Sequence, residues 1–143
     1  MPRIILDMPE KFSFSTTIPV RITDINYGGH LGNDALLSIL HEARIQYLQS
    51  IGCSELDAYG AGLIMADAAI TYKGEGFQGD VLRVELTAGE LTTRGFALFY
   101  RVSCRRDETD IFIAEARTGM LCFNYETRKV IVLPDQLREK LTV

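Results

Sequence analysis

The feature that most constrains the fold is a single long helical repeat, from about residue 31 to 52, followed by a chain that reads as strands. Apolar residues recur in this repeat at intervals of three and four, which is the spacing of one helix face. They are Leu36, Leu37, Leu40, Ala43, Tyr47, Leu48 and Ile51. Gly52 follows the last of them, where a glycine commonly ends a helix. The pattern predicts one long amphipathic helix.

Segments with the composition of β-strands flank the predicted helix. One precedes it, over residues 11–23, and contains Pro19, which lacks a ladder donor and therefore suits an edge strand. The segments that follow cover residues 62–75, 79–92, 94–106, 110–126 and 129–133. The short breaks between them favour antiparallel hairpins. After Pro134, a short amphipathic segment carries Leu137 and Leu141, four residues apart.

One helix against an antiparallel sheet of five to six strands is an α+β arrangement. The 143 residues fit a single domain, and no internal repeat or linker divides them. Such a sheet leaves edges that must be covered or paired. We therefore expect self-association, as a dimer or a tetramer.

Composition excludes several classes of protein. The net charge is −4 and the basic residues are scattered, whereas a nucleic-acid-binding protein needs a clustered basic face. No apolar run has the length of a signal peptide or a membrane span. Cys53, Cys104 and Cys122 are odd in number and widely spaced, which predicts free buried thiols in the cytoplasm, with a catalytic thiol as the alternative. The two histidines lack a metal-ligand spacing, so we expect no metal.

The stretch "DINYGGHLGND", residues 24–34, joins the first predicted strand to the start of the helix. Its glycines let the backbone approach a ligand closely. The first helical amides have no intrahelical partner, and the helix dipole favours negative charge there. Such amides can hold the oxyanion of an acyl-transfer intermediate, and a carboxylate on the loop can activate water or attack the carbonyl. The stretch thus offers the two parts that thioester hydrolysis needs.

These residues also carry a family resemblance. The pattern D-x-[DN]-x-x-G-[HV]-[VL]-x-N is matched by Asp24, Asn26, Gly29, His30, Leu31 and Asn33. Together with "EARIQYL" at 42–48 and "FQGDVLRVE" at 77–85, it makes the chain resemble the hotdog-fold thioesterases, nearest to the 4-hydroxybenzoyl-CoA thioesterase-like acyl-CoA hydrolases. The resemblance runs from about residue 14 to 133. It implies a hotdog fold and hydrolysis of an acyl-CoA or acyl-carrier-protein thioester, with coenzyme A as part of the substrate and no other cofactor.

The resemblance also implies roles for individual residues. In the family the second acidic position is the catalytic carboxylate, but here that position is Asn26, which cannot act as a base. Three alternatives follow: Asp24 takes over, another carboxylate activates water, or the chain binds acyl thioesters without cleaving them. The main-chain amide of Asn33 corresponds to the one that polarises the thioester carbonyl. The resemblance extends more distantly to the plant acyl-carrier-protein thioesterases, and His30 matches the active-site histidine of that branch.

Glu42 is a further catalytic candidate, because related hotdog thioesterases use a glutamate on the central helix; the alternative is a solvated helix face. The candidates for substrate binding are Gly29, Asp67, Lys73, Arg128 and Lys129. Asp67 interrupts an apolar run, which places it near a site or, by default, on the solvent side. The three cations lie at strand ends or turns, where they can meet the phosphates of coenzyme A or remain solvated.

Overall fold

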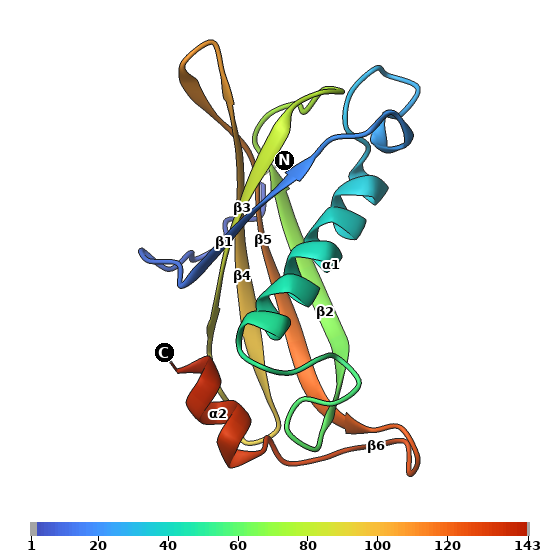
Figure 1. The fold of residues 1–143 in the computed structure, drawn as a ribbon, viewed down its shortest axis with the longest axis vertical. Helices are drawn as coiled ribbons and strands as arrows, with labels where there is room; N and C mark the ends of the chain where they lie inside the picture. Colours follow the sequence, from blue (N-terminus) through green and yellow to red (C-terminus); the bar gives the residue numbers. More distant parts are fainter. Residues whose placement is uncertain (1–2, 143) are drawn as a thin grey trace.

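A computed structural model, which describes residues 3–142, shows one long helix lying across one face of an antiparallel sheet (Figure 1). The strands are β1 (Phe14–Pro19), β2 (Gly62–Tyr72), β3 (Val81–Gly89), β4 (Gly95–Arg106), β5 (Thr109–Asn124) and β6 (Lys129–Val130). The helices are the 3-10 turn η1 (Ile22–Asp24), α1 (Asn33–Ser50) and α2 (Asp135–Leu141). This architecture confirms the predicted α+β hotdog arrangement.

The sheet runs in the order β1-β3-β4-β5-β2, and β6 pairs with the end of β5. β1 and β2 are therefore its two edges. Pro19 lies at the end of β1, so the prediction of an edge strand is confirmed. β2 is the longer edge and pairs with β5 through a register shift between Met65 and Asp67.

The core lies between α1 and the face of the sheet that it covers. Leu36, Leu40 and Leu48 of α1 are almost fully buried there, as their spacing predicted. Leu37 was predicted to belong to the same stripe but is 44% exposed. Arg44, in contrast, is only 6% exposed. The buried face of α1 is thus less apolar than its sequence indicates.

Two strands are less than half as long as predicted, the first and the last. The first ends at Pro19, because the Asp24 carboxylate accepts a hydrogen bond from the Arg21 N–H (2.9 Å) and closes the η1 turn. The last is reduced to Lys129–Val130, after which the chain turns into α2. Leu137 and Leu141 are buried, which confirms the amphipathic segment predicted after Pro134.

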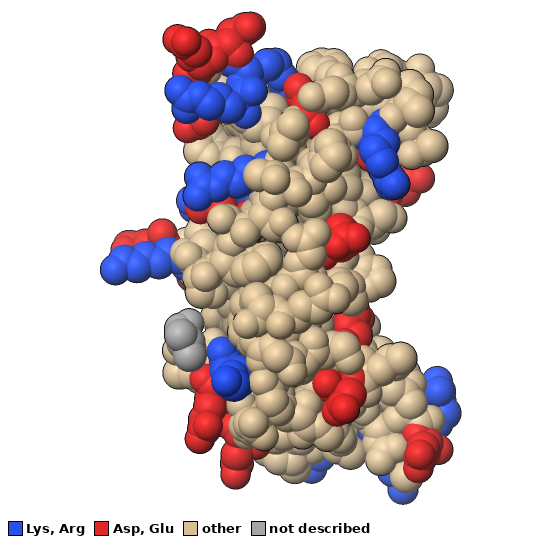
Figure 2. Space-filling model, in the orientation of Figure 1, with Lys and Arg blue, Asp and Glu red and all other residues tan. Residues whose placement is uncertain are grey.

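The distribution of surface charge and the state of the cysteines can be compared with the predictions from composition. Figure 2 shows Lys and Arg scattered over the visible face rather than gathered into one patch. Within residues 3–142, no helix has the length and apolar character to cross a membrane. All three cysteines are free, Cys104 and Cys122 buried and Cys53 half-buried. Burial raises the pKa of Cys53 and of Cys122 to about 11, so both remain protonated and poor nucleophiles near neutral pH.

Candidate active site

The loop between η1 and α1 is held in place by backbone hydrogen bonds. The Gly32 N–H donates to the Asp24 carbonyl (2.9 Å), and the Asn26 N–H donates to the His30 carbonyl (2.9 Å). The Leu31 N–H donates to the Gly76 carbonyl (2.7 Å), which ties the loop to the β2–β3 connection. Gly29 has a φ of +83°, a conformation that suits glycine, and makes the turn possible. The loop is thus a fixed platform at the start of α1.

Two pockets flank the N-terminal half of α1. One has a volume of about 920 Å³ and is lined by residues that include Asn26, His30 and Asn33; we call it the amide pocket. The other has a volume of about 390 Å³ and is lined by residues that include Asp24 and Glu42; we call it the carboxylate pocket. The structure therefore divides the five predicted catalytic residues into two groups.

The amide pocket contains a free backbone donor. Asn33 is the first residue of α1, after Gly32 at the N-cap. The Asn33 side chain accepts a hydrogen bond from the Asp34 N–H (3.0 Å), but the Asn33 N–H itself has no acceptor among residues 3–142. First-turn amides lack intrahelical partners, and the positive end of the helix dipole lies there. The Asn33 amide is therefore free to donate to a ligand, and its role in binding the thioester carbonyl stays a prediction.

His30 lines the same pocket as Asn33, and the tautomer of its ring follows from its contacts. Nδ1 is 3.2 Å from the Leu31 carbonyl oxygen. A hydrogen bond at this distance requires a proton on Nδ1, so Nε2 of the neutral ring carries a lone pair. An imidazole nitrogen in this state can accept a proton from water.

Asn26 organises the loop around His30. Its Oδ1 accepts hydrogen bonds from the Gly28 N–H (2.9 Å) and the His30 N–H (3.4 Å). This is the local turn that Asn side chains commonly make. Asn26 thus holds the histidine-bearing segment, and it lines the amide pocket together with His30.

The carboxylate pocket has a different character, because both of its acids already have protein partners. Asp24 is 6% exposed and accepts the Arg21 N–H; its carboxylate also forms an ion pair with the Arg21 guanidinium (3.4 Å). Glu42 accepts a hydrogen bond from Gln46 (2.9 Å) one turn further along α1. The helix residues that line this pocket begin at Ser38, more than a turn beyond the first helical amides.

The amide pocket also contains residues that were not predicted as site residues, among them Asp34, Tyr72 and Glu75. The Tyr72 hydroxyl lies 3.5 Å from the Asn33 carbonyl oxygen. Burial, and then the charge of Asp34, raise the pKa of Tyr72, so it is a hydrogen-bond donor at neutral pH. Asp34 lies in the first turn of α1. Glu75 carried no sequence signal, because it reaches the pocket only through the folded β2–β3 connection.

The predicted substrate-binding residues are dispersed. The Asp67 carboxylate accepts the Gly119 N–H (3.0 Å) and pairs with Arg117 (3.2 Å), while its side chain remains 68% exposed. Lys73 follows Tyr72 of the amide pocket but pairs with Glu115 (3.4 Å). Arg128 lies 5.6 Å above the Phe123 ring. Arg128 and Lys129 belong to the β6 end of the molecule, opposite the start of α1 (Figure 1).

No cluster of three or more metal-ligating side chains occurs within residues 3–142. The amide pocket combines a helix-terminal amide that can donate to an oxyanion with a histidine that can accept a proton, which are groups that acyl transfer can use.

Comparisons with known proteins identify the family. The sequence profile of the thioesterase-like superfamily matches residues 20–141, and the chain belongs to this superfamily. A 1,4-dihydroxy-2-naphthoyl-CoA hydrolase from Synechococcus elongatus is 30% identical over 129 residues, which cover 87% of this chain and 91% of the relative. The Microcystis aeruginosa protein of the same name is 28% identical over 125 residues, covering 85% and 88%.

Solved structures show the same fold. A 1,4-dihydroxy-2-naphthoyl-CoA thioesterase from Synechocystis superposes with a TM-score of 0.79 at 24% identity, over 90% of this chain and 95% of that one. A 4-hydroxybenzoyl-CoA thioesterase variant complexed with 4-hydroxybenzoyl-CoA gives 0.81 at 16% identity, over 90% and 97%. The predicted hotdog fold and thioester-hydrolase class are thus confirmed.

Proposed function

We propose that this protein hydrolyses acyl-CoA thioesters in the amide pocket. The observation that carries the proposal is the unpartnered Asn33 N–H at the start of α1, in the same pocket as His30. The thioester carbonyl oxygen accepts a hydrogen bond from this amide. When water adds to the carbonyl carbon, the oxygen becomes an oxyanion, and the helix terminus stabilises the developing charge.

His30 is our candidate for the general base. Nε2 removes a proton from the attacking water, and a tetrahedral intermediate forms at the thioester carbon. The C–S bond then breaks, the carbonyl re-forms as a free acid, and the leaving thiolate takes the proton from the imidazolium. Asp34 and Glu75 line the same pocket and are the carboxylates that can serve instead. Asp24, our first candidate from the sequence, supports the loop from the other side.

Coenzyme A is the carrier that the relatives favour over an acyl-carrier protein. The hydrolases from Synechococcus elongatus and Microcystis aeruginosa carry 1,4-dihydroxy-2-naphthoyl-CoA in their names. We propose that the present protein accepts an acyl-CoA with an aromatic or medium-length acyl group. The free state of all three cysteines supports a reducing compartment, and we propose the cytoplasm.

We further propose a homodimer formed through β2, which can in turn stack into a tetramer. β2 is an eleven-residue edge whose Met65 and Tyr72 are 44% and 40% exposed. Antiparallel pairing of two β2 strands sets the end of one beside the start of the other. Gly62, at the start of β2, pairs with Phe123, and Arg128 stacks on that ring. A second copy would thereby bring Arg128 and Lys129 towards the amide pocket, where they can meet the phosphates of coenzyme A.

A second candidate function is binding of an acyl thioester without hydrolysis. Asn26 favours it, because a carboxamide stands where the family has its catalytic carboxylate, and this carboxamide is engaged in a turn. The two functions differ in whether a thiol is released.

The test is thiol release from a panel of short, medium and aromatic acyl-CoAs, with Asn33→Pro and Asn33→Ala as a matched pair. Proline is well tolerated at the first helical position, and Gly32 has the extended conformation (φ −72°, ψ 149°) that a residue before proline adopts. Asn33→Pro removes the N–H and should lower kcat by about 100- to 1,000-fold. Asn33→Ala keeps the N–H and should stay within about threefold. Binding without thiol release by the wild type would instead establish the second function.

A further inference from the structure

A third pocket lies beyond the amide pocket, between α1, β2 and β5. It has a volume of about 240 Å³, and its lining includes Leu37, Leu40, His41, Arg44, Met65 and Thr118; we call it the arginine pocket. Asn33, Leu37 and Arg44 stand at positions i, i+4 and i+11 of α1, so one helix face leads from the amide pocket to the arginine pocket.

The wall opposite this helix face is apolar. Met65, Ala68, Ile70 and Tyr72 of β2 pair with residues of β5 whose side chains are buried beneath α1, namely Met120, Thr118, Ala116 and Ala114. They therefore face the same side of the sheet as those residues. Together with the exposed Leu37, they form an apolar track that joins the two pockets.

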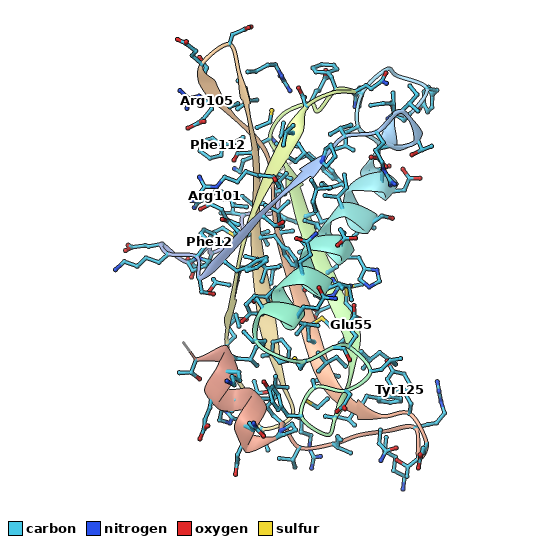
Figure 3. All side chains as sticks on the ribbon, in the orientation of Figure 1. Phe12, Glu55, Arg101, Arg105, Phe112 and Tyr125 are labelled. Atoms are coloured by element: carbon cyan, nitrogen blue, oxygen red, sulfur yellow. The ribbon has the colours of Figure 1, made fainter. Side chains whose placement is uncertain are left out.

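Arg44 is a buried cation with an incomplete set of partners. Its Nη1 donates to the Tyr100 hydroxyl (3.2 Å). Its buried Nε has no hydrogen-bond partner and lies 3.6 Å from Glu55 Oε1, which also contacts His41 Nε2 at 2.7 Å. Glu55 comes from the loop after α1 and approaches from the C-terminal side of the helix (Figure 3). Glu55 balances the charge of Arg44, but the buried Nε still lacks a hydrogen-bond partner, and such an atom on a side chain that lines a pocket points to a ligand.

The neighbouring hydroxyl also presents a proton to the arginine pocket. The Tyr100 oxygen accepts from Arg44 and lies 2.8 Å from Thr118 Oγ1. Either hydroxyl can be the donor in this contact; when Tyr100 donates to Thr118, the Thr118 proton is left to point into the arginine pocket, which Thr118 lines. Arg44 and Thr118 can thus both donate to a ligand at this end of the track.

We infer that Arg44 and Thr118 select acyl groups whose far end carries an uncharged hydrogen-bond-acceptor oxygen. This inference rests on the proposed thioester hydrolysis, because the acyl group reaches the arginine pocket only when its carbonyl lies at Asn33. A carbonyl or hydroxyl oxygen at the far end accepts from both donors. A carboxylate is disfavoured, because Glu55 already balances the charge of Arg44.

The distance between the pockets limits the length of the acyl group. The eleven residues from Asn33 to Arg44 correspond to about 16 Å along a helix axis. Helical side chains lean towards the N-terminus, so the guanidinium lies closer to Asn33 than its Cα does. A medium-length chain or a fused ring fills this span, and a two-carbon acyl group does not reach the donors.

The experiment compares octanoyl-CoA, 7-oxooctanoyl-CoA and the mono-CoA thioester of suberic acid. For the wild type we expect kcat/KM to be about 10- to 100-fold higher with the keto group than with the plain chain, as for a hydrogen bond from a charged donor. Thr118→Val should reduce that preference several-fold, and Arg44→Met should abolish it, while octanoyl-CoA is still cleaved. Glu55→Gln removes the balancing charge and should shift the preference towards the carboxylate.

Affinities for the matching non-hydrolysable thioether analogues separate the two proposals. If the wild type releases no thiol, hydrolysis fails as the function, but a keto preference in binding that disappears in Arg44→Met still supports the donor site. If the wild type cleaves or binds all three chains equally, or if Arg44→Met keeps the preference while its thermal unfolding shows a folded protein, the inference is overturned.

Discussion

The amide pocket and the carboxylate pocket lie beside the same helix, yet they differ in whether their polar groups already have hydrogen-bond partners within the protein. In the amide pocket, the Asn33 N–H has no acceptor within residues 3–142, and His30 keeps a free ring nitrogen. In the carboxylate pocket, Asp24 and Glu42 already accept hydrogen bonds from their own neighbours. The two pockets teach that an acid in a motif can be fully engaged by its own loop, whereas the amide pocket keeps groups that can still bind a ligand.

The substitution with the largest expected effect, and the strongest test of this comparison, is His30→Gln. The variant keeps a polar side chain of similar size but removes the basic nitrogen. We expect kcat for acyl-CoA hydrolysis to fall by at least about 100-fold, the usual contribution of a general base. Stopped assays of thiol release measure kcat for both proteins, and circular dichroism verifies that the variant is folded. A loss of kcat smaller than tenfold would indicate that Asp34 or Glu75 is the general base. The variants Asp34→Asn and Glu75→Gln would then show which of the two it is.

Asp24→Ala tests the other side of the comparison. The change removes the acceptor that closes η1, so we expect the free energy of unfolding to fall by about 1–2 kcal/mol. Because Asp24 lines the carboxylate pocket, kcat should stay within about threefold of the wild type at a temperature where both are folded. Urea titration gives the stability. A 100-fold loss of kcat with normal stability would return Asp24 to the role of base.

Low pH should weaken a contact that supports the amide pocket. Asp80 accepts hydrogen bonds from Arg106 (2.6 Å) and from the Phe77 N–H (2.8 Å), and Arg106 also donates to the Glu75 carbonyl (2.9 Å). Burial would raise the pKa of Asp80, but the Arg106 hydrogen bond, the Phe77 N–H and the Arg106 charge together hold it below its ordinary value.

The sign of the effect follows from this lowered pKa. The stabilisation is present above the ordinary aspartate pKa of about 3.9 and is lost as the pH falls through the lower folded-state value. We expect the wild type to lose the contribution of the ionised Asp80 to its unfolding free energy on acidification. The Asp80→Asn variant should lack this contribution already at pH 7. Urea titrations between pH 7 and 3 measure the difference. Parallel pH curves for the two proteins would contradict the expectation.

The smallest effect is expected for Glu42→Gln. Its hydrogen bond with Gln46 is an exposed contact between residues four apart, worth about 0.3–0.5 kcal/mol. Stability should therefore change by no more than that, and kcat should remain within about twofold. A much larger loss of kcat would show that a second subunit places Glu42 in a shared site.

The order of elements could be predicted from the chain because it depends on local patterns. The apolar spacing along residues 33–50, the edge position of Pro19 and the buried pair Leu137 and Leu141 all follow from periodicity or from a missing N–H. The Asn33 amide could likewise be predicted, since every helix start leaves free donors.

Other features depend on groups that meet only in the fold. The sequence by itself determined the fold class, the thioesterase family and the loop before α1, because periodicity and a short motif carry that information. Only the tertiary structure separated Asp24 from Asn33, brought Glu75 into the amide pocket and buried Arg44 between Glu55 and Tyr100. The physical reason is that a polar group acts according to the partners that surround it, and those partners come from distant parts of the chain.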